Sequence, residues 1–387
     1  MKRAVFGCIG AGYFANAQHL PNSVWAPHIE LRTVCDIRED AVRAAQKKFN
    51  IPKGETDYRK VLADPEIDAV FVITRPEDHS RLTVEALKAG KHVYVEKPLA
   101  ETLEECEAVI DAQVKAKRHV AVGFNRRFAP AYRKAMELLA KHGGAQNIFY
   151  RVTDTYSYTW GKNYPPGRRV FHETCHIFDA LRWMTGSEPA SVYCVEARAD
   201  DEAIVVKFAS GPVATIMSSG WSSLDWPKES LEVIAGKGGL TVDNFVELRT
   251  YGFGDAEDVY RFPGHVHPDH DFTHRFMFEA LGSEAMRALY KIRFRFWEEF
   301  NPDAAFPADP GEAAIARDFN RHHSPHGYDA DKGWRQAADH FAECILTGEQ
   351  PENADARDGL IAEHMAVACA KSRETHAPVL MTEYGIG

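Results

Sequence analysis

A glycine-rich stretch near the start of the chain has the residues to hold a large anion. An apolar run over residues 5–9 leads into Gly10-Ala11-Gly12, and Ala15 follows in a helix-compatible segment. Glycine lets the backbone turn sharply and approach a ligand, and a small residue at position 15 lets helix and strand pack closely. Because the amide groups at such a helix start carry partial positive charge, the stretch predicts a pyrophosphate site.

An acidic residue follows at the distance that a dinucleotide-binding fold requires. Asp36 lies 24 positions after Gly12, beyond a second apolar run over residues 29–34. A carboxylate there bonds ribose hydroxyls and repels a 2′-phosphate, so NAD is favoured over NADP. Arg38 keeps NADP open, because its guanidinium is able to receive that phosphate. Capping of the next helix is an alternative role for Asp36, and the two roles are compatible.

A second stretch combines histidines and a glutamate at metal-ligand spacing. His172-Glu173-Thr174-Cys175-His176 matches the pattern of a zinc-peptidase helix, with both histidines on one helical face. A zinc site also needs a third ligand and a zincin-like fold, which the surrounding α/β pattern does not supply. The histidines at 265, 267 and 270 are interrupted by Pro268 and have no second ligand cluster, which favours surface histidines. No metal is therefore expected.

The first part of the chain alternates between strand-like and helix-like segments. Apolar runs of strand length lie at residues 5–9, 29–34, 68–74, 91–95 and 119–123, with helical patterns at 39–49, 57–62, 79–89 and 102–117. This alternation predicts an α/β domain over residues 1–123 with a doubly wound parallel sheet of the Rossmann type. Its ligands are expected at the carboxyl ends of the strands.

After residue 123 the pattern changes to strands in quick succession. Helical patterns cover 130–141, 172–184, 334–346 and 358–371, and strand-like runs lie at 147–154, 191–198, 203–208, 213–218, 231–235, 240–243, 246–251 and 379–381. Short turns between successive strands predict a large, mostly antiparallel open sheet with helices, an α+β domain over residues 124–387. Residues 255–330 fit neither pattern and are expected to be an insertion.

Composition argues against several classes of partner. With 387 residues and a net charge of −10, the chain is expected to form two domains and to bind neither nucleic acid nor a membrane. No apolar run approaches the roughly 20 residues needed to cross a bilayer. The seven scattered cysteines, with no C-x-x-C pair, indicate reduced thiols. Because the first strand begins almost at the N-terminus, a cytoplasmic protein without a signal peptide is expected.

Three motifs, in order along the chain, resemble one known family. The glycine turn and Asp36 are followed by Gly90-Lys91-His92-Val93-Tyr94-Val95-Glu96-Lys97-Pro98-Leu99-Ala100, and then by Gly123-Phe124-Asn125-Arg126-Arg127-Phe128. Together these stretches resemble the Gfo/Idh/MocA family, which are NAD(P)-dependent oxidoreductases of sugars and inositols. The similarity extends over nearly the whole chain except residues 255–330.

The resemblance implies catalytic roles for Lys97 and His176. Lys97 follows a strand at the edge where parallel sheets bind ligands, and its ammonium is able to bond a substrate hydroxyl. An imidazole exchanges protons near neutral pH, which suits His176 as general acid/base. The family's Asp-x-x-x-His helix has an aspartate where this chain has His172, with Glu173 beside it. Either Glu173 replaces that carboxylate or the substrate geometry differs, so both residues are catalytic candidates.

The resemblance also implies binding residues for cofactor and substrate. Cofactor contacts are expected from Tyr13, Phe14, Thr74, Pro76, His79, Glu96, Lys97 and Asn125, in addition to Gly10, Gly12, Ala15, Asp36 and Arg38. Substrate contacts are expected from Arg127, Tyr156, Trp160, Arg168 and Asp179. Aromatic faces suit the C–H face of a pyranose, although loop aromatics serve equally well in packing. His79 has a purely structural alternative as a residue near the start of a helix.

These features predict hydride transfer between a nicotinamide cofactor and a secondary alcohol. The expected substrates are sugars, glycosides, sugar acids or cyclic polyols, with NAD as cofactor and NADP still open. One alternative is NAD-dependent cleavage of a glycosidic bond by oxidation and elimination, and another is a non-catalytic, cofactor-binding regulatory protein. The expected assembly is a homodimer or homotetramer formed through the open face of the second sheet.

Overall fold

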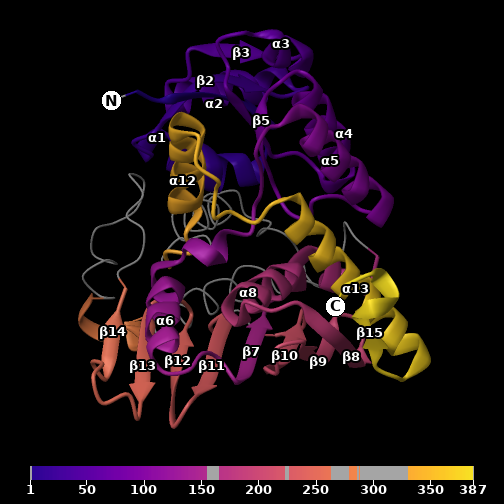
Figure 1. Ribbon diagram of the computed structural model, residues 1–387. Coiled ribbons are helices and arrows are strands. Elements are labelled where there is room, and N and C mark those ends of the chain that lie inside the picture. The colour runs from indigo at the N-terminus through magenta and orange to yellow at the C-terminus, as the bar shows by residue number, and fades with distance from the viewer. Residues whose placement is uncertain are drawn as a thin grey trace, which may run out of the picture. The chain divides into compact units, whose positions relative to one another are not determined.

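Two compact units make up the chain (Figure 1). The computed structural model describes residues 2–154, 165–222, 226–262, 279–285, 287 and 330–386. The first unit comprises Met1–Phe128, Phe178–Ala180 and Gly333–Ala366, and the second comprises Ala129–Ile177, Leu181–Lys332 and Val367–Gly387. Because these units group residues by contact alone, the domain boundary between residues 123 and 124 stays a prediction.

The first unit contains a six-stranded parallel sheet. Its strands are β1 (Ala4–Ile9), β2 (Ile29–Cys35), β3 (Lys53–Glu55), β4 (Ala69–Val72), β5 (His92–Val95) and β6 (Val120–Val122). They lie in the order β3-β2-β1-β4-β5-β6, and every neighbouring pair is parallel. This order confirms the predicted doubly wound Rossmann sheet. The sequence does not predict β3, because Lys53-Gly54-Glu55 has no apolar side chain.

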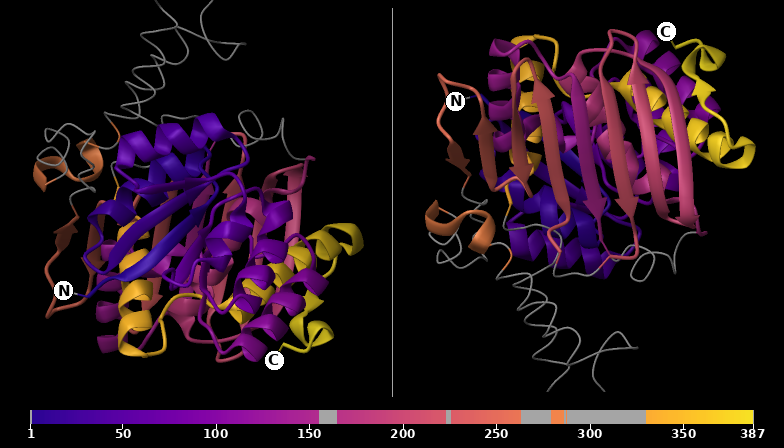
Figure 2. Two further views of the ribbon diagram at one scale, coloured as in Figure 1. Left: turned by 90° about the horizontal axis from the view of Figure 1, so that it is seen from above. Right: turned by 90° about the horizontal axis from the view of Figure 1, so that it is seen from below.

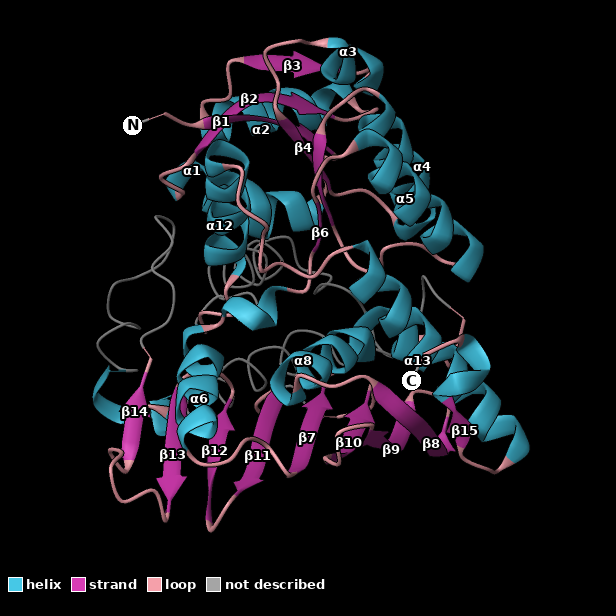
Figure 3. Ribbon diagram, in the orientation of Figure 1, coloured by secondary structure: helices cyan, strands magenta, loops and turns pink. Residues whose placement is uncertain are grey.

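Helices pack on both faces of this sheet (Figure 3). They are α1 (Leu20–Trp25), α2 (Glu39–Phe49), α3 (Tyr58–Ala63), α4 (Pro76–Lys88), α5 (Leu103–Ala116) and α12 (Trp334–Thr347). α12 joins from far along the chain, and the centroid of its Phe341 ring lies 6.5 Å from that of Phe6 and 6.0 Å from that of Tyr94. α4 begins three residues earlier than predicted, because the fixed φ of Pro76 suits the first turn of a helix.

The second unit contains a nine-stranded sheet. Its strands are β7 (Asn147–Thr153), β8 (Pro189–Arg198), β9 (Asp201–Phe208), β10 (Val213–Ser219), β11 (Glu229–Ala235), β12 (Gly238–Asp243), β13 (Glu247–Tyr251), β14 (Val259–Arg261) and β15 (Val379–Leu380). Among these described strands, β7 and β10 pair in parallel and the other neighbours are antiparallel. The predicted mostly antiparallel sheet is therefore confirmed. β14 lies inside the segment 255–330, so the sheet extends into the expected insertion.

One face of this sheet is covered by α6 (Pro130–Lys141) and α8 (Cys175–Thr185), and the other face carries no described helix (Figure 2). The side chains of β9 alternate accordingly, because successive residues of a strand point to opposite faces. Ile204 and Val206 are buried, whereas Val205 is exposed. The sheet is thus open on one side, as the alternating sequence pattern predicts.

Two further expectations concern membranes and thiols. In the described ranges, no helix has the length and apolarity needed to cross a bilayer. All seven cysteines are free and buried, in agreement with the reduced thiols predicted from their spacing.

Candidate functional site

The glycine turn lies at the carboxyl end of β1, and its two glycines serve different purposes. Gly10 has a φ of +106°, and a Cβ there would lie 2.0 Å from the carbonyl oxygen of Ile73. Packing of the sheet against its own loops therefore requires glycine at this position. Among the described residues, and apart from its chain neighbours, a Cβ at Gly12 would meet no atom within 4 Å. Gly12 instead leaves open space beside the turn, where a pyrophosphate is able to approach the backbone.

The residues after the turn pack into the first unit to different degrees. Tyr13 is largely exposed, whereas Ala15 is fully buried, as close contact between helix and strand requires. The Phe14 ring packs edge-on against the rings of His19 and Trp334. Whether Tyr13 and Phe14 contact a cofactor stays a prediction.

Asp36 is fixed next to the glycine turn. Its Oδ2 accepts a hydrogen bond from the Ala11 N–H at 2.8 Å, and its Oδ1 accepts one from the Arg38 N–H at 3.0 Å. The N-cap of α2 is Arg38, so Asp36 is not the N-cap residue of this helix. The Arg38 Nε lies 3.8 Å from Asp36 Oδ1, and its side chain is 60% exposed. A carboxylate and an accessible guanidinium thus lie together at the carboxyl end of β2.

Lys97 lies directly after β5, in a turn held by a buried glutamate. The Oε2 of Glu96 accepts a hydrogen bond from the Lys97 N–H at 3.1 Å. The Oε1 of Glu96 lies 2.7 Å from Nε2 of His19. Burial acts to raise the pKa of Glu96, but the His19 hydrogen bond and the Lys97 charge outweigh it and hold that pKa below its ordinary value. Glu96 is therefore ionised where it meets the Lys97 backbone.

His79 holds the next residue of the same turn. Its Nδ1 lies 2.7 Å from the carbonyl oxygen of Pro98, and its Nε2 lies 3.3 Å from that of Thr74. Burial lowers the pKa of His79, so the ring is neutral, and we assign its N–H to the shorter contact. His79, which lies near the start of α4 with Pro76, thereby joins this helix to the turn after β5. This matches the structural alternative for His79, and contacts of these residues with a cofactor stay predictions.

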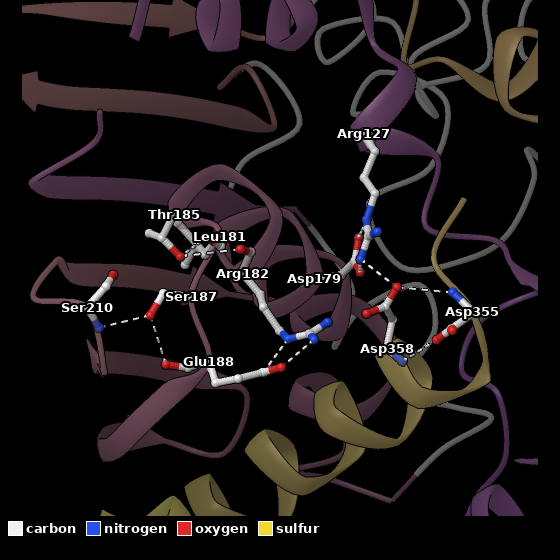
Figure 4. Close-up of polar contacts among 10 residues, drawn as sticks. All are labelled: Arg127, Asp179, Leu181, Arg182, Thr185, Ser187, Glu188, Ser210, Asp355 and Asp358. Carbon is white, nitrogen blue, oxygen red and sulfur yellow. Dashed lines mark hydrogen bonds and ion pairs between the residues drawn. The ribbon is translucent and has the colours of Figure 1, made fainter. Parts of the chain in front are cut away.

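Arg127 and Asp179 are bonded to each other within the first unit (Figure 4). Arg127 Nε and Nη2 donate to the two oxygens of Asp179 at 3.0 and 2.5 Å, and Nη2 also lies 3.0 Å from Asp358 Oδ2. The two paired side chains are 9% and 1% exposed, respectively. Asp358 comes from α13 (Ala356–Thr375). Asn125, two positions before Arg127, is fully buried. Bidentate pairing fixes the middle of α8, while contact of Arg127 or Asp179 with substrate stays a prediction.

The second unit places three candidate catalytic residues at the start of α8. A π-helical turn, η3 (Val170–Thr174), contains His172 and Glu173, and His176 follows in the first turn of α8. These three side chains are 5%, 9% and 7% exposed, in chain order. Within the described residues, no three His, Cys, Asp or Glu side chains are arranged to hold a metal ion. The histidines at 265, 267 and 270 lie outside the described residues.

A row of alternating charges holds Glu173. Lys228 Nζ lies 2.8 Å from Glu173 Oε1 and 3.1 Å from Asp154 Oδ2. Arg169, whose side chain is fully buried, donates from Nη1 to Asp154 Oδ1 at 2.7 Å. Burial acts to lower the pKa of Lys228, but Glu173 and Asp154 outweigh it and raise that pKa above its ordinary value. Lys228 is thus cationic, and its charge lies between the two carboxylates of the row.

His19 and Lys228 support candidate site residues in the structure, but no sequence motif includes either of them. His19 lies 77 positions before Glu96, and Lys228 lies outside every motif that points to chemistry. For His19, the one signal in the sequence is its position in the helix-compatible segment just after the glycine turn. For Lys228 there is none, because its partners come from segments distant in the sequence.

The remaining substrate candidates, Tyr156, Trp160 and Arg168, precede η3 in the sequence. The Arg168 guanidinium lies over the Phe171 ring, 4.2 Å from its centroid. This stacking orients the side chain and leaves its predicted contact with substrate untested. Tyr156 and Trp160 lie outside the described residues.

A Rossmann sheet with a glycine turn and an acidic residue at its carboxyl edge, together with an open antiparallel sheet, defines a class of dinucleotide-binding oxidoreductases. Residues 5–124 match the family model described as "Oxidoreductase family, NAD-binding Rossmann fold". Through this match residues 5–124 are identified with the Gfo/Idh/MocA family of oxidoreductases.

Similar proteins include several inositol dehydrogenases. Myo-inositol 2-dehydrogenase of Thermotoga maritima is 29% identical over 254 residues, which cover 62% of this chain and 75% of that protein. The scyllo-inositol 2-dehydrogenase (NAD(+)) of Bacillus subtilis is 31% identical over 199 residues, covering 50% and 56%. Scyllo-inositol dehydrogenase of Lactobacillus casei, solved with NAD(H) and scyllo-inositol, has a TM-score of 0.67 at 19% identity, over 98% of this chain and 100% of that chain. At this identity the structural likeness concerns the fold.

Proposed function

We propose that this oxidoreductase is a dehydrogenase that moves a hydride between NAD and a secondary alcohol of a sugar, glycoside, sugar acid or cyclic polyol. The observation that carries the proposal is the position of Lys97, directly after β5 and with its N–H held by ionised Glu96. Parallel sheets bind ligands at the carboxyl ends of their strands, which is where this turn lies. The inositol dehydrogenases among the relatives support a polyol or carbohydrate as substrate.

The residues at the carboxyl ends of β1 and β2 fit a dinucleotide. The open space beside Gly12 suits a pyrophosphate, and the fixed carboxylate of Asp36 suits the ribose hydroxyls. A negative charge at Asp36 favours NAD, whereas the accessible Arg38 is the group that would meet the 2′-phosphate of NADP. When bound, the nicotinamide supplies the hydride acceptor or donor.

The protein's own side chains handle the proton and the charge of the substrate hydroxyl. The Lys97 ammonium donates a hydrogen bond to the hydroxyl oxygen and stabilises negative charge as it develops there. His176 takes the hydroxyl proton as general base. Glu173, paired with Lys228, is the carboxylate that stands in for the aspartate of the family's helix, with His172 beside it.

The test combines a substrate panel with two variants. Wild-type protein is assayed for NADH and NADPH formation against inositols, aldoses, glycosides and sugar acids. On the best substrate, Lys97→Ala and His176→Ala are each expected to lower kcat by about 10²–10⁴-fold, because each removes a group that acts on the reacting oxygen. NAD binding, measured by calorimetry, is expected to persist in both variants.

A matched control and product analysis separate the alternatives. Lys115→Ala removes an exposed lysine from α5 and is expected to leave turnover unchanged. Stoichiometric NADH supports the dehydrogenase, whereas glycoside cleavage without net NADH indicates oxidation and elimination. Near-normal turnover in both Lys97→Ala and His176→Ala contradicts the proposed roles, and absence of turnover on the whole panel favours a non-catalytic protein.

We also infer that the protein forms a homodimer or homotetramer through the uncovered face of the nine-stranded sheet. Val195, Val205 and Met217, on the neighbouring strands β8, β9 and β10, are 41%, 39% and 41% exposed. Apolar side chains gathered on an open sheet face favour association. Analytical ultracentrifugation measures the number of subunits.

A further inference from the structure

One buried pair in the first unit joins the two motifs that the proposed chemistry uses. His19 lies in the π-helical turn η1 (Ala15–His19), which begins at the last residue of the glycine motif. Its Nε2 lies 2.7 Å from Oε1 of Glu96, in the motif that contains Lys97. The side chains of His19 and Glu96 are 2% and 6% exposed, respectively. Two segments 77 positions apart are thus joined by a hydrogen bond in the protein interior.

The surroundings of His19 leave the pair well shielded from water. Its ring lies 5.5 Å from Phe14, 5.9 Å from Phe71 and 5.7 Å from Tyr94, between ring centroids. Hydrogen bonds and charges are stronger in such a low-dielectric setting than in water. Removal of the imidazole would leave the Glu96 carboxylate buried without this partner, which costs more than loss of a surface contact.

Glu96 transmits its position to Lys97 through the backbone. While Oε1 meets His19, Oε2 accepts the Lys97 N–H at 3.1 Å. Gly123 makes room for this carboxylate, because a Cβ at that position would lie 2.6 Å from Glu96 Oε1. The carboxylate is therefore fixed on both oxygens and by the space around it.

The other end of the connection is tied to the glycine turn. Asn16 Nδ2 donates to the carbonyl oxygens of Ala11 and Gly12 at 2.7 and 2.9 Å. Asn16 and His19 belong to the same π-helical turn, and such turns are frequent at functional sites. A continuous set of hydrogen bonds and covalent links thus runs from the turn at Gly12 to the backbone of Lys97.

We propose that His19 is a positioning residue which, through Glu96, fixes Lys97 relative to the glycine turn that receives the dinucleotide. The inference rests on the proposed function, in which Lys97 acts on the substrate oxygen. His19 touches neither substrate nor cofactor in this role. A small displacement of Lys97 is enough to lower turnover, because reacting groups work only within a narrow geometry.

Three variants separate positioning from folding stability. His19→Phe keeps an aromatic ring among the surrounding rings but removes the donor to Glu96. His19→Gln restores a side-chain N–H, and the double variant His19→Phe, Glu96→Gln removes the buried charge that His19→Phe leaves behind. Thermal unfolding identifies any variant that is not folded, and the double variant keeps the test available in that case.

The expected kinetic result is a loss in kcat that depends on Lys97. His19→Phe lowers kcat by about 10–100-fold with NAD affinity within about threefold of wild type, and His19→Gln recovers most of the loss. In a Lys97→Ala background, His19→Phe has little further effect, because the residue it positions is gone. An equal loss with and without Lys97 overturns the proposal, as does unchanged kcat in folded His19→Phe.

A second readout does not depend on turnover. Hydrogen exchange of the peptide spanning residues 92–99 reports on the Lys97 N–H, which is protected by Glu96 in the wild type. His19→Phe is expected to speed this exchange at least about tenfold without NAD, with a smaller difference when NAD is added. Unchanged exchange overturns the positioning role. If the wild type turns over no carbohydrate, the proposed function fails, and the exchange result alone decides whether His19 fixes this turn.

Discussion

The turn at Lys97 and the start of α8 are held in place by different means. In the first unit, one buried pair, His19 with Glu96, contacts the turn at the backbone N–H of Lys97. In the second unit, a row of alternating charges fixes the start of α8: Arg169, Asp154, Lys228 and Glu173. One region depends on a pair, and the other depends on a balance among four charges.

The difference predicts how each region responds to loss of one member. Removal of His19 deprives a single carboxylate of its partner. Removal of Lys228 takes a cationic partner from two carboxylates at once, because its ammonium lies between Asp154 and Glu173. Buried charges that lose their partners destabilise a fold strongly. We therefore expect stability to depend most on the charge row, and reaction geometry to depend most on the His19 pair.

The largest stability effect is expected for Lys228→Met. Methionine fills a similar volume, so the main change is the loss of the charge between Asp154 and Glu173. The free energy of unfolding is expected to fall by about 3 kcal/mol, measured by urea denaturation. Adding Glu173→Gln is expected to recover part of this loss, because it removes one of the two negative charges that Lys228 balances.

An exposed lysine supplies the control for this comparison. Lys207→Met changes a residue on the open face of β9, whose Nζ bonds only the Gly211 carbonyl among the contacts described for it. Its stability is expected to stay within about 0.5 kcal/mol of wild type. Equal effects for Lys207→Met and Lys228→Met would contradict the importance of the charge row.

The residues proposed to act and the contacts that hold them differ in how far the sequence predicts them. The glycine turn, Asp36 and Lys97 could be predicted, because each is part of a short motif or lies at a fixed distance from one. Most strand runs of both sheets could be predicted from apolar patterns. β3 could not, because it has only polar residues and glycine, and neither could the three-residue strand β14 inside the segment 255–330. The pairing of β7 with β10 is parallel although the chain pattern suggests antiparallel neighbours.

The supporting contacts could not be predicted, because they depend on three-dimensional proximity. His19 and Glu96 are far apart in the sequence, and the partners of Lys228 come from the end of β7 and from η3. No local propensity marks a π-helical turn, and the two that the structure describes, η1 and η3, contain candidate site residues. The sequence thus predicts the groups that act, and the structure adds the groups that hold them.

Two buried glutamates give the next test of the comparison. Glu96 has a pKa below its ordinary value, whereas burial raises the pKa of Glu202 to about 7, although Arg169 and Arg373 oppose this shift. One oxygen of Glu202 accepts a hydrogen bond from Arg373 at 3.1 Å, and the other is buried without a described hydrogen-bond partner. Partner geometry, and not burial alone, therefore decides which glutamate is ionised at neutral pH.

The consequence for stability follows from proton binding. Because its pKa is raised on folding, Glu202 binds a proton more tightly in the folded state than in the unfolded state. Its stabilising contribution is present at low pH and is lost as the pH rises toward and through about 7. Between pH 5 and pH 8, wild type is expected to lose on the order of 1–3 kcal/mol more stability than Glu202→Gln, measured by urea denaturation. Parallel pH profiles would contradict the raised pKa.

The smallest effect on stability is expected at Gly12, an uncharged position beside the proposed pyrophosphate site. Gly12→Ala adds a methyl group into open space, so the free energy of unfolding is expected to change by less than about 0.5 kcal/mol. The same methyl group occupies the approach of the pyrophosphate, so the Kd for NAD is expected to rise about tenfold, which equals about 1.4 kcal/mol. Gly10→Ala is the matched contrast, because its methyl group would meet the Ile73 carbonyl and lower stability. Calorimetric NAD binding equal to wild type in Gly12→Ala would show that the pyrophosphate does not approach this turn.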